Sequence, residues 1–313
     1  MLRYLASRII GLVGVTLVVS FLAFMMLYKL PGGPFSQTRQ PLSATAMAAI
    51  RAKYRLDQPF YVVWFSWVTH AMIGDFGTSY KAENVPIIRL FADHWGVSLQ
   101  LGALALSWSL PLGILGGILA ATHRNKAVDL VLRILCTLAT SIPSFTLALG
   151  LLFLFAVRLH WVASSAWKPL ENPGGALLPV FIFGLGPFGV LLRYTRNGLL
   201  DGLSQDYVRT ARAKGLHERF VIRRHVLRNV MIPIITVLAP MLPGALTGSA
   251  LIERVFGING IGSYFIDSIT SRDYPMVLAT TVLVAMLWGL TYVLTDVLYV
   301  MIDPRIRLGS RVQ

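Results

Sequence analysis

The densest group of ionisable side chains lies between residues 193 and 229. This segment carries nine Lys and Arg residues against Asp201, Asp206 and Glu218, and it separates two long apolar runs. Cations at this density bind either an acidic protein surface or anionic lipid, where each contributes on the order of 1 kcal/mol. Charge alone leaves both alternatives open: a docking element for another protein, or a basic pair of helices on the membrane surface.

Residues for other kinds of chemistry are sparse. No Gly-x-x-x-x-Gly-Lys-Ser/Thr phosphate loop occurs, so any ATP must be handled by another chain. The six histidines form no His-x-x-x-His pair and Cys136 is the only cysteine, which argues against a metal site. No Gly-x-Ser-x-Gly motif indicates a hydrolase. Asp296 is the one acid inside an apolar run, and its position near the end of that run favours a structural role. The chain is therefore not expected to be an enzyme or to bind a cofactor.

Composition predicts a membrane protein. Of 313 residues, 55% are hydrophobic and 13% are charged, and the mean hydropathy is +0.66. Six uncharged runs are long enough to cross about 30 Å of hydrocarbon as helices. They are Ile9–Tyr28, Val97–Ala121, Ile134–Val157, Ala176–Leu192, Val230–Ile252 and Met276–Thr295. The fourth is the shortest and contains prolines, so we expect it inside the bundle, where neighbours can satisfy its backbone.

Charge placement predicts the orientation. An even number of spans puts both termini on one side, together with residues 122–133 and 193–229. Most of the 28 Lys and Arg residues lie on that side, and basic residues near span ends prefer the cytoplasm. We expect cytoplasmic N- and C-termini. The net charge of +14 then needs no nucleic-acid partner, and membrane lipid is the expected surroundings.

The chain divides into three expected parts. Residues 1–30 hold an N-terminal segment and the first span, residues 31–96 form an outer segment with short helices, and residues 97–313 form the core with the other five spans. In the outer segment, Ala44–Tyr54 has helical composition, and Phe60–Ile73 is apolar but too short to span. Gly74–Thr78 supplies turn residues after it. In the outer loop before the last span, Asp267 and Asp273 are expected to be solvated or to contact a binding protein.

The basic loop predicts two short helices around a glycine corner. Val208, Ala211 and Gly215 share one helix face, Gly215 is a natural helix stop, and a second helix is expected over Glu218–Asn229. Small residues at the corner would let another protein approach closely. The candidate residues for contact with such a partner are Asp206, Arg209, Thr210, Ala211, Ala213, Lys214, Gly215 and Leu216.

The fifth apolar run is the candidate transport pathway. Its prolines prevent a straight ladder of hydrogen bonds, and its small residues leave room beside the backbone. The candidates are Pro240, Met241, Pro243, Gly244, Thr247, Gly248 and Ser249. The third run repeats this pattern more weakly at Ser141–Ser144.

Short motifs in order along almost the whole chain carry a family resemblance. They include Leu30–Phe35 (LPGGPF), Tyr54–Pro59 (YRLDQP), Gly74–Tyr80 (GDFGTSY), Gly257–Gly262 (GINGIG), Arg272–Pro275 (RDYP) and Asp303–Arg307 (DPRIR). With the Arg209–Gly215 stretch, they resemble the B subunits of oligopeptide and dipeptide ABC importer permeases. The resemblance implies that the eight candidate contact residues of the basic loop couple the chain to an ATPase. The family's coupling motif has an acidic residue and a closing proline that this loop lacks.

The resemblance implies an all-α integral membrane protein with the type I (MetI-like) ABC importer permease fold. It implies a multi-pass subunit of a bacterial inner membrane that forms half of a peptide pathway. Its implied partners are a homologous second permease, two cytoplasmic ATP-binding subunits that hold ATP and Mg²⁺, and an extracytoplasmic peptide-binding protein. A stand-alone secondary transporter or channel is the alternative from another class, and nickel or glutathione is the alternative cargo.

Overall fold

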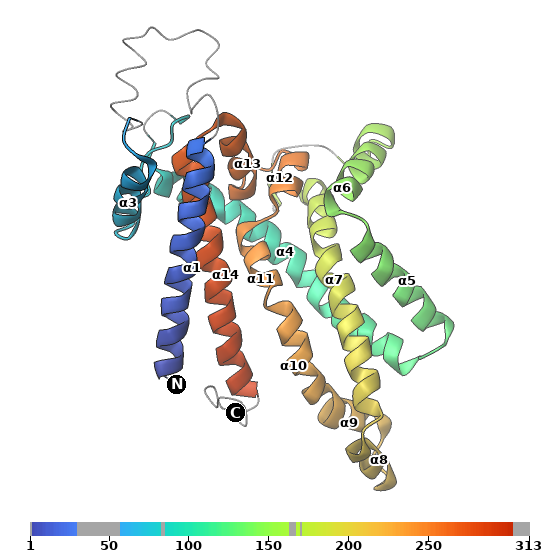
Figure 1. Cartoon of the computed structure of the whole chain (residues 1–313). Helices are drawn as coiled ribbons and strands as arrows, with labels where there is room; N and C mark the ends of the chain where they lie inside the picture. The colour runs from blue at the N-terminus through green and yellow to red at the C-terminus, as the bar shows by residue number, and fades with distance from the viewer. Residues whose placement is uncertain (1, 30–56, 83–84, 163–166, 170, 303–313) are drawn as a thin grey trace.

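The protein is a bundle of long helices that lie side by side, with shorter helices at both ends of the bundle (Figure 1). The computed structural model describes residues 2–29, 57–82, 85–162, 167–169 and 171–302. Four helices are long and apolar enough to cross a membrane unbroken: α1 (Leu2–Lys29), α4 (Ile87–Thr122), α7 (Pro173–Leu203) and α14 (Tyr274–Ile302). Counting each of two bent helix pairs as one span gives six. This is the number that the apolar runs predict.

The basic loop lies at the same end of the bundle as the start of α1 and the end of α14. We call this the inner end, and it holds α8 (Asp206–Ala213) and α9 (Glu218–Val221). The outer end holds α3 (Phe60–Ala71), α12 (Ala250–Phe256) and α13 (Ile261–Ser271) (Figure 1). The described helix ends and the basic loop therefore share one side, as an even number of spans requires.

Helices α4 and α7 pack against each other along much of their length. Glycines make this approach possible: a Cβ atom at Gly117 of α4 would lie 2.5 Å from Cβ of Thr195 and 2.8 Å from the backbone oxygen of Leu192 on α7. Farther out, a Cβ atom at Gly184 of α7 would lie 2.5 Å from the ring of Trp108 on α4. Apolar helices gain little by leaving lipid for one another, so such close contact is what holds them together.

The fourth span is longer than the uncharged run 176–192 predicts. Helix α7 starts at Pro173, where the side chain of Asn172 accepts a hydrogen bond from the backbone N–H of Gly175 at 3.2 Å, and it continues to Leu203. Arg193 and Arg196 do not end it, because their guanidinium groups donate to side chains of a neighbouring helix. Its predicted place inside the bundle is confirmed, since α7 packs against α4, α5, α6 and α10.

The third span is sharply broken, whereas the sequence predicted one run with only weak pathway character. Helix α5 (Ala127–Ser141) and the pair α6 (Ser144–Leu152) and η1 (Phe153–Arg158), a π-helix, meet at 98°. The cause is local: Pro143 drives the preceding Ile142 into extended backbone, with φ −89° and ψ 125°. A continuous helix through this point is therefore impossible.

The fifth span is divided into three helices. They are α10 (Leu227–Leu238), α11 (Met241–Thr247) and α12, with Pro240 between the first two. Gly248 separates α11 from α12 with φ +73° and ψ −175°, a conformation that is accessible almost only to glycine. The bend at this point is 42°, so the break that the prolines and glycines predict is present but is less sharp than that in the third span.

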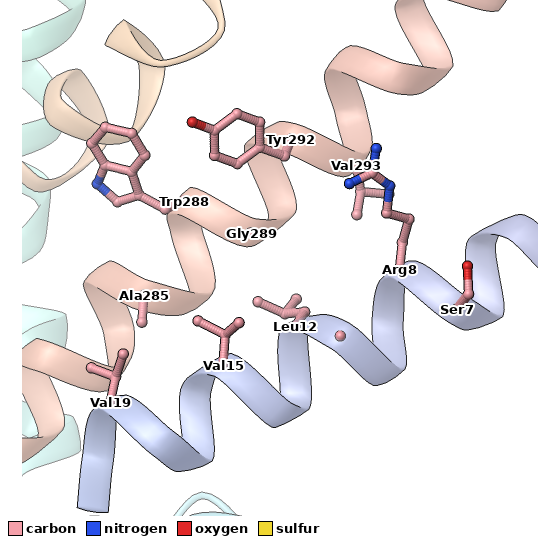
Figure 2. Close-up of a pocket in the computed structure, with 11 residues that line it drawn as sticks. Ser7, Arg8, Leu12, Val15, Val19, Ala285, Trp288, Gly289, Tyr292 and Val293 are labelled. Carbon is pink, nitrogen blue, oxygen red and sulfur yellow. The ribbon is translucent and has the colours of Figure 1, made fainter. Parts of the chain in front are cut away.

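Helices α1 and α14 pair at the edge of the bundle. Leu12 of α1 packs directly on Gly289 of α14, where a Cβ atom would lie 2.0 Å from Leu12 Cδ1. Both residues line a groove of about 570 Å³ between the two helices (Figure 2). At the inner end of this pair, Arg8 forms a 3.0 Å salt bridge with Asp296. The acid inside the last apolar run therefore joins two helices, which agrees with the structural role that its position predicts.

The outer segment is described in part. Helix α3 packs on α1, and the indole N–H of Trp64 donates to the hydroxyl of Ser20 at 3.1 Å. The predicted helix Ala44–Tyr54 lies outside the described residues. The reading of Asp273 as solvated or binding-protein-facing was wrong: it is buried, and it accepts hydrogen bonds from the Ser79 hydroxyl and, at 3.1 Å, from the Tyr80 backbone. Asp267 instead pairs with Arg254 at the surface.

We predict that Gly117→Leu destabilises the protein, because overpacking a closed contact costs about 1–3 kcal/mol or more. The yield of monodisperse protein in detergent and its thermal midpoint should both fall. Gly96→Leu on the same helix is the matched control, since a Cβ atom there meets nothing within 4 Å. Equal behaviour of the two variants would show that the α4–α7 contact is not a close-packed one.

Candidate functional site

A glycine corner shapes the inner loop. Helix α8 ends at Ala213, and Gly215 adopts φ +76°. The backbone N–H of Gly215 donates to the Arg212 carbonyl at 2.9 Å, and that of Leu216 donates to the Ala211 carbonyl at 3.3 Å. This pair of bonds satisfies carbonyls that a helix end leaves open, and it requires a left-handed residue, which glycine adopts without strain. The chain is thereby turned into α9.

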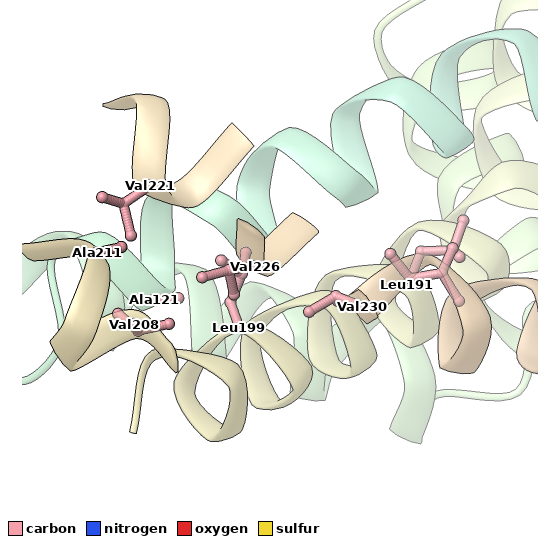
Figure 3. Packing of buried hydrophobic residues seen from close by; sticks show 9 residues of the cluster. Ala121, Leu191, Leu199, Val208, Ala211, Val221, Val226 and Val230 are labelled. Carbon is pink, nitrogen blue, oxygen red and sulfur yellow. The ribbon is translucent and has the colours of Figure 1, made fainter. Parts of the chain in front are cut away.

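The inward face of α8 is anchored in an apolar cluster. Val208 and Ala211 are buried against Leu199 of α7 and against Val221 and Val226 beyond the corner (Figure 3). An eight-residue helix is too short to be stable alone in water, so this packing is what keeps it formed. Residues 206–221 thus form one compact element, which we call the inner knob.

The structure divides the predicted coupling residues into two groups. Ala211 is buried and Leu216 is half-buried, so these two hold the knob on the bundle rather than offering a surface. In this conformation the Ala211 side chain packs against the bundle and does not face a partner. The others are exposed: Asp206, Arg209, Thr210, Ala213, Lys214 and Gly215. A Cβ atom at Gly215 would meet nothing within 4 Å, so the corner itself is open.

The second helix of the loop is not the separate unit predicted over Glu218–Asn229. Helix α9 passes into a π-helix, η2 (Ile222–Val226), and then directly into α10 of the fifth span. The sequence predicted a helix that ends at Asn229, but Val221 and Val226 give this stretch a buried face and the helix continues beyond that residue. The knob is consequently joined to the fifth span without a linker.

An ion pair closes the knob across its corner. The guanidinium of Arg212 donates to both carboxylate oxygens of Glu218, at 2.6 and 3.0 Å. This hydrogen bonding lowers the pKa of Glu218 and raises the pKa of Arg212. The pair is complete above the ordinary glutamate pKa and is lost only as the pH falls through the lowered value. It therefore stays formed at neutral pH.

A second ion pair, which sequence reasoning missed, ties the inner end of α5 to α7. Asp129 is fully buried, and Arg196 donates to both of its oxygens, at 2.7 and 2.9 Å. The backbone N–H of Asn125 adds a third bond at 3.0 Å. In the sequence, Asp129 sits among basic residues and looks like part of a solvated charge run. Only the fold reveals that it is buried, and there it fastens the inner end of α5 to that of α7.

Three of the predicted pathway residues line a hollow in the bundle. Pro240, Met241 and Gly244 face α4 and α7 across a cavity of about 170 Å³. Its opposite walls are apolar and come from Gly102, Ala105, Leu106, Phe183 and Pro187.

The other four pathway candidates serve the backbone. Pro243 is buried, and the Thr247 hydroxyl donates to its carbonyl at 2.9 Å. Ser249 caps α12 by accepting from the Ile252 N–H at 3.4 Å, and Gly248 forms the break described above. In this conformation these residues shape the path of the chain and do not line the hollow. Within the described ranges, no cluster of three or more His, Cys, Asp or Glu side chains could hold a metal ion.

Two family models together match most of the chain. The model "Binding-protein-dependent transport system inner membrane component" matches residues 113–308, and its N-terminal companion, "Binding-prot-dependent transport system membrane comp, N-term", matches residues 1–98. The first covers more than half of the chain, including the inner knob and the whole fifth span.

Similar proteins match over nearly their full length. The dipeptide transport system permease protein DppB of Lactococcus lactis is 37% identical over 98% of this chain and 100% of its own. The oligopeptide transport system permease protein OppB of Escherichia coli K12 is 36% identical over 98% and 100%. The glutathione transport system permease protein GsiC of Salmonella choleraesuis is 36% identical over 98% and 99%.

A solved structure shares the fold. The MetNI methionine ABC transporter in an inward-facing conformation aligns with a TM-score of 0.51 and 16% identity, over 69% of this chain and 97% of that chain. Members of the matched family are permease subunits that bind no cofactor, and separate ATPase subunits hold the ATP. The chain thus belongs to the binding-protein-dependent inner membrane components, as a non-catalytic, multi-pass permease subunit of an ABC importer with ATPase and binding-protein partners.

Proposed function

We propose that this permease forms half of the pathway of an ATP-driven importer of short peptides, and that the inner knob couples it to the ATPases. The observation that carries the proposal is the geometry of the knob. Its inward face is fixed by Val208 and Ala211, while its corner at Gly215 is open, and it continues directly into the fifth span. A rigid element of this kind transmits displacement instead of absorbing it.

The size of the hollow favours a second permease subunit. Pockets that enclose small ligands measure about 300–1,000 Å³, whereas the space beside Pro240, Met241 and Gly244 is about 170 Å³. One chain therefore cannot enclose a peptide at this position. A homologous partner that brings its own fifth span would enlarge the path. The small and apolar lining would leave side-chain selection to the binding protein.

Relatives support peptides as the substrate class. The dipeptide, oligopeptide and glutathione permeases match at nearly equal identity, and glutathione is itself a tripeptide in composition. Short peptides are the chemistry these three share. Nickel transport and transport without an ATPase are the competing functions, and both make different predictions in reconstitution.

In the proposed cycle, ATP binding closes a dimer of ATPase subunits and displaces the knob. Because η2 leads into α10, the displacement passes to the inner part of the fifth span, which is free to bend at Pro240. The path then opens outward to accept a peptide from the binding protein. Hydrolysis resets the inward-open state.

Reconstitution tests this function directly. Proteoliposomes that hold the chain with its companion permease, ATPases and binding protein should take up a labelled tripeptide only with ATP. Gly215→Trp should lower uptake about tenfold or more, because loss of about 1.4 kcal/mol of docking free energy is already a factor of ten. Gly215→Asn is the matched control, since asparagine tolerates φ > 0 and adds little bulk.

Two outcomes would contradict the proposal. Peptide flux through the purified chain without ATPases would favour a stand-alone transporter. Normal ATP-driven uptake by Gly215→Trp would remove the knob corner from the docking surface. Competition by unlabelled glutathione or by nickel ions decides the cargo, because a peptide pathway should respond to the first and not to the second.

The Arg212–Glu218 pair should control coupling more than stability. Glu218→Lys opposes two cations at the corner and should reduce the ATPase stimulation by loaded binding protein. The thermal midpoint should shift little, because exposed ion pairs contribute less than about 1 kcal/mol. The double variant Arg212→Glu with Glu218→Lys restores opposite charges and should recover most of the stimulation. Failure of the double variant to recover would assign the effect to the individual side chains.

Orientation is testable with two lysines at opposite ends of the bundle. In a Lys214→Cys variant, an impermeant maleimide should react only from the cytoplasmic side, whereas in Lys81→Cys it should react only from outside. Both positions are exposed. The native Cys136 is buried and supplies the background rate. Labelling of Lys214→Cys in intact cells would invert the proposed topology.

A further inference from the structure

A buried glutamate lies at the outer end of the fifth span. Glu253 on α12 has no exposed surface. The hydroxyl of Ser98 on α4 donates to its Oε1 at 2.8 Å, and the backbone N–H of Ser263 donates to its Oε2 at 2.9 Å. Ser263 lies in the first turn of α13, where the helix dipole favours a negative charge. Through these two hydrogen bonds, Glu253 connects α12 to α4 and to α13.

Three glycines enclose this carboxylate. A Cβ atom at Gly248 would lie 1.9 Å from Oε1, and Cβ atoms at Gly260 and Gly262 would lie 2.5 and 2.9 Å from Oε2. Any residue larger than glycine at these three positions would overlap the carboxyl group of Glu253. The backbone on both sides of α12 is thus shaped around one carboxyl group.

Further contacts extend this attachment along the outer turns of α4. Besides donating to Glu253, the Ser98 hydroxyl accepts from the Ile261 N–H at 2.9 Å. The indole N–H of Trp95 donates to the Leu246 carbonyl of α11 at 2.7 Å. Nδ1 of His94 lies 3.0 Å from the carbonyl oxygen of Asn259. We call this set of contacts between α4 and α11–α13 the outer seam.

A buried carboxyl group that lacks a hydrogen-bond partner is costly, and the bond from Ser98 to Glu253 exists only while the outer seam is closed. If α4 separated from α12, Glu253 would lose the Ser98 hydroxyl, and Ser98 would leave the Ile261 N–H unpaired. The neighbouring Arg254 cannot compensate, because it points to the surface and pairs with Asp267. Opening at this level is therefore opposed by several buried groups together.

We propose that Glu253 is a positioning residue for transport, which fastens the outer part of the fifth span to α4 so that both move as one body. This rests on the proposed function only in assuming an ATP-driven cycle. The break at Gly248 is then a fixed corner, and the bending of the fifth span during transport is confined to the inner break at Pro240. The hollow beside Gly244 keeps its outer wall throughout the cycle.

Cross-linking tests whether the outer seam opens. In the assembled complex carrying His94→Cys and Asn259→Cys, a short bismaleimide should link the two positions at the same rate in the nucleotide-free state and in the state trapped with ATP and vanadate. A clear difference between the states would overturn the proposal. Single-cysteine variants control for Cys136 and for reagent access. No substrate is used, so this result is independent of the peptide assignment.

Glu253→Gln tests the role of the carboxylate. Glutamine keeps the shape of the side chain but replaces one oxygen with an N–H₂ group, which then faces the hydroxyl of Ser98 or the N–H of Ser263. Loss of that hydrogen bond should shift the equilibrium toward the open outer seam by at least about a factor of ten. The cross-linking rate in this variant should become dependent on the nucleotide state, and substrate moved per ATP should fall about tenfold.

Arg254→Gln on the same helix is the control and should change neither quantity. A Glu253→Gln complex that retains both wild-type values would contradict the proposal. If that variant does not assemble, the cross-linking of the Glu253 protein still decides whether the seam opens.

Discussion

The contact between α4 and α7 is the constraint on which the rest of the structure depends. Lipid tails are as apolar as the helices they surround, so two spans associate only where their surfaces fit closely. Gly117 and Gly184 provide that fit by leaving no room for a side chain. Every functional feature is attached to this pair. The knob packs on Leu199 at its inner end, the hollow lies against its middle, and the outer seam begins at Ser98.

The breaks in the helices are tolerable because each one satisfies its backbone locally. A backbone carbonyl or N–H without a hydrogen-bond partner inside hydrocarbon costs several kcal/mol. This cost is the reason that irregular loops are not exposed to lipid. At the break in the third span the Ile142 N–H still donates to the Leu138 carbonyl at 3.4 Å, and at Gly248 the Ser249 side chain caps the next helix. Each break therefore has a defined backbone geometry. A conformational change of the bundle is easiest at a break whose surrounding side chains are not closely packed.

The sequence predicted what depends on composition and periodicity. The six apolar runs, the basic inner loop and its glycine corner follow from local residue types, and each is present in the structure. Features that depend on distant partners could not be predicted. Asp129 becomes a buried anchor only because Arg196 arrives from α7, and Glu253 is buried only because Ser98 and the glycines surround it. Likewise, Arg193 ended the predicted fourth span, because its hydrogen bond to Thr140 could not be known from the sequence.

The fifth span also shows why equal local signals had unequal outcomes. Prolines and glycines mark Pro240, Gly244 and Gly248 alike as weak points, yet their surroundings differ. Gly248 is held by a carboxylate and by Ser98, whereas Gly244 borders open space and Pro240 is exposed. Displacement that enters through the knob reaches Pro240 first, and there it meets the less restrained of these joints. A helix that is weak at several points along its sequence can thus bend at one place, because packing has closed the others.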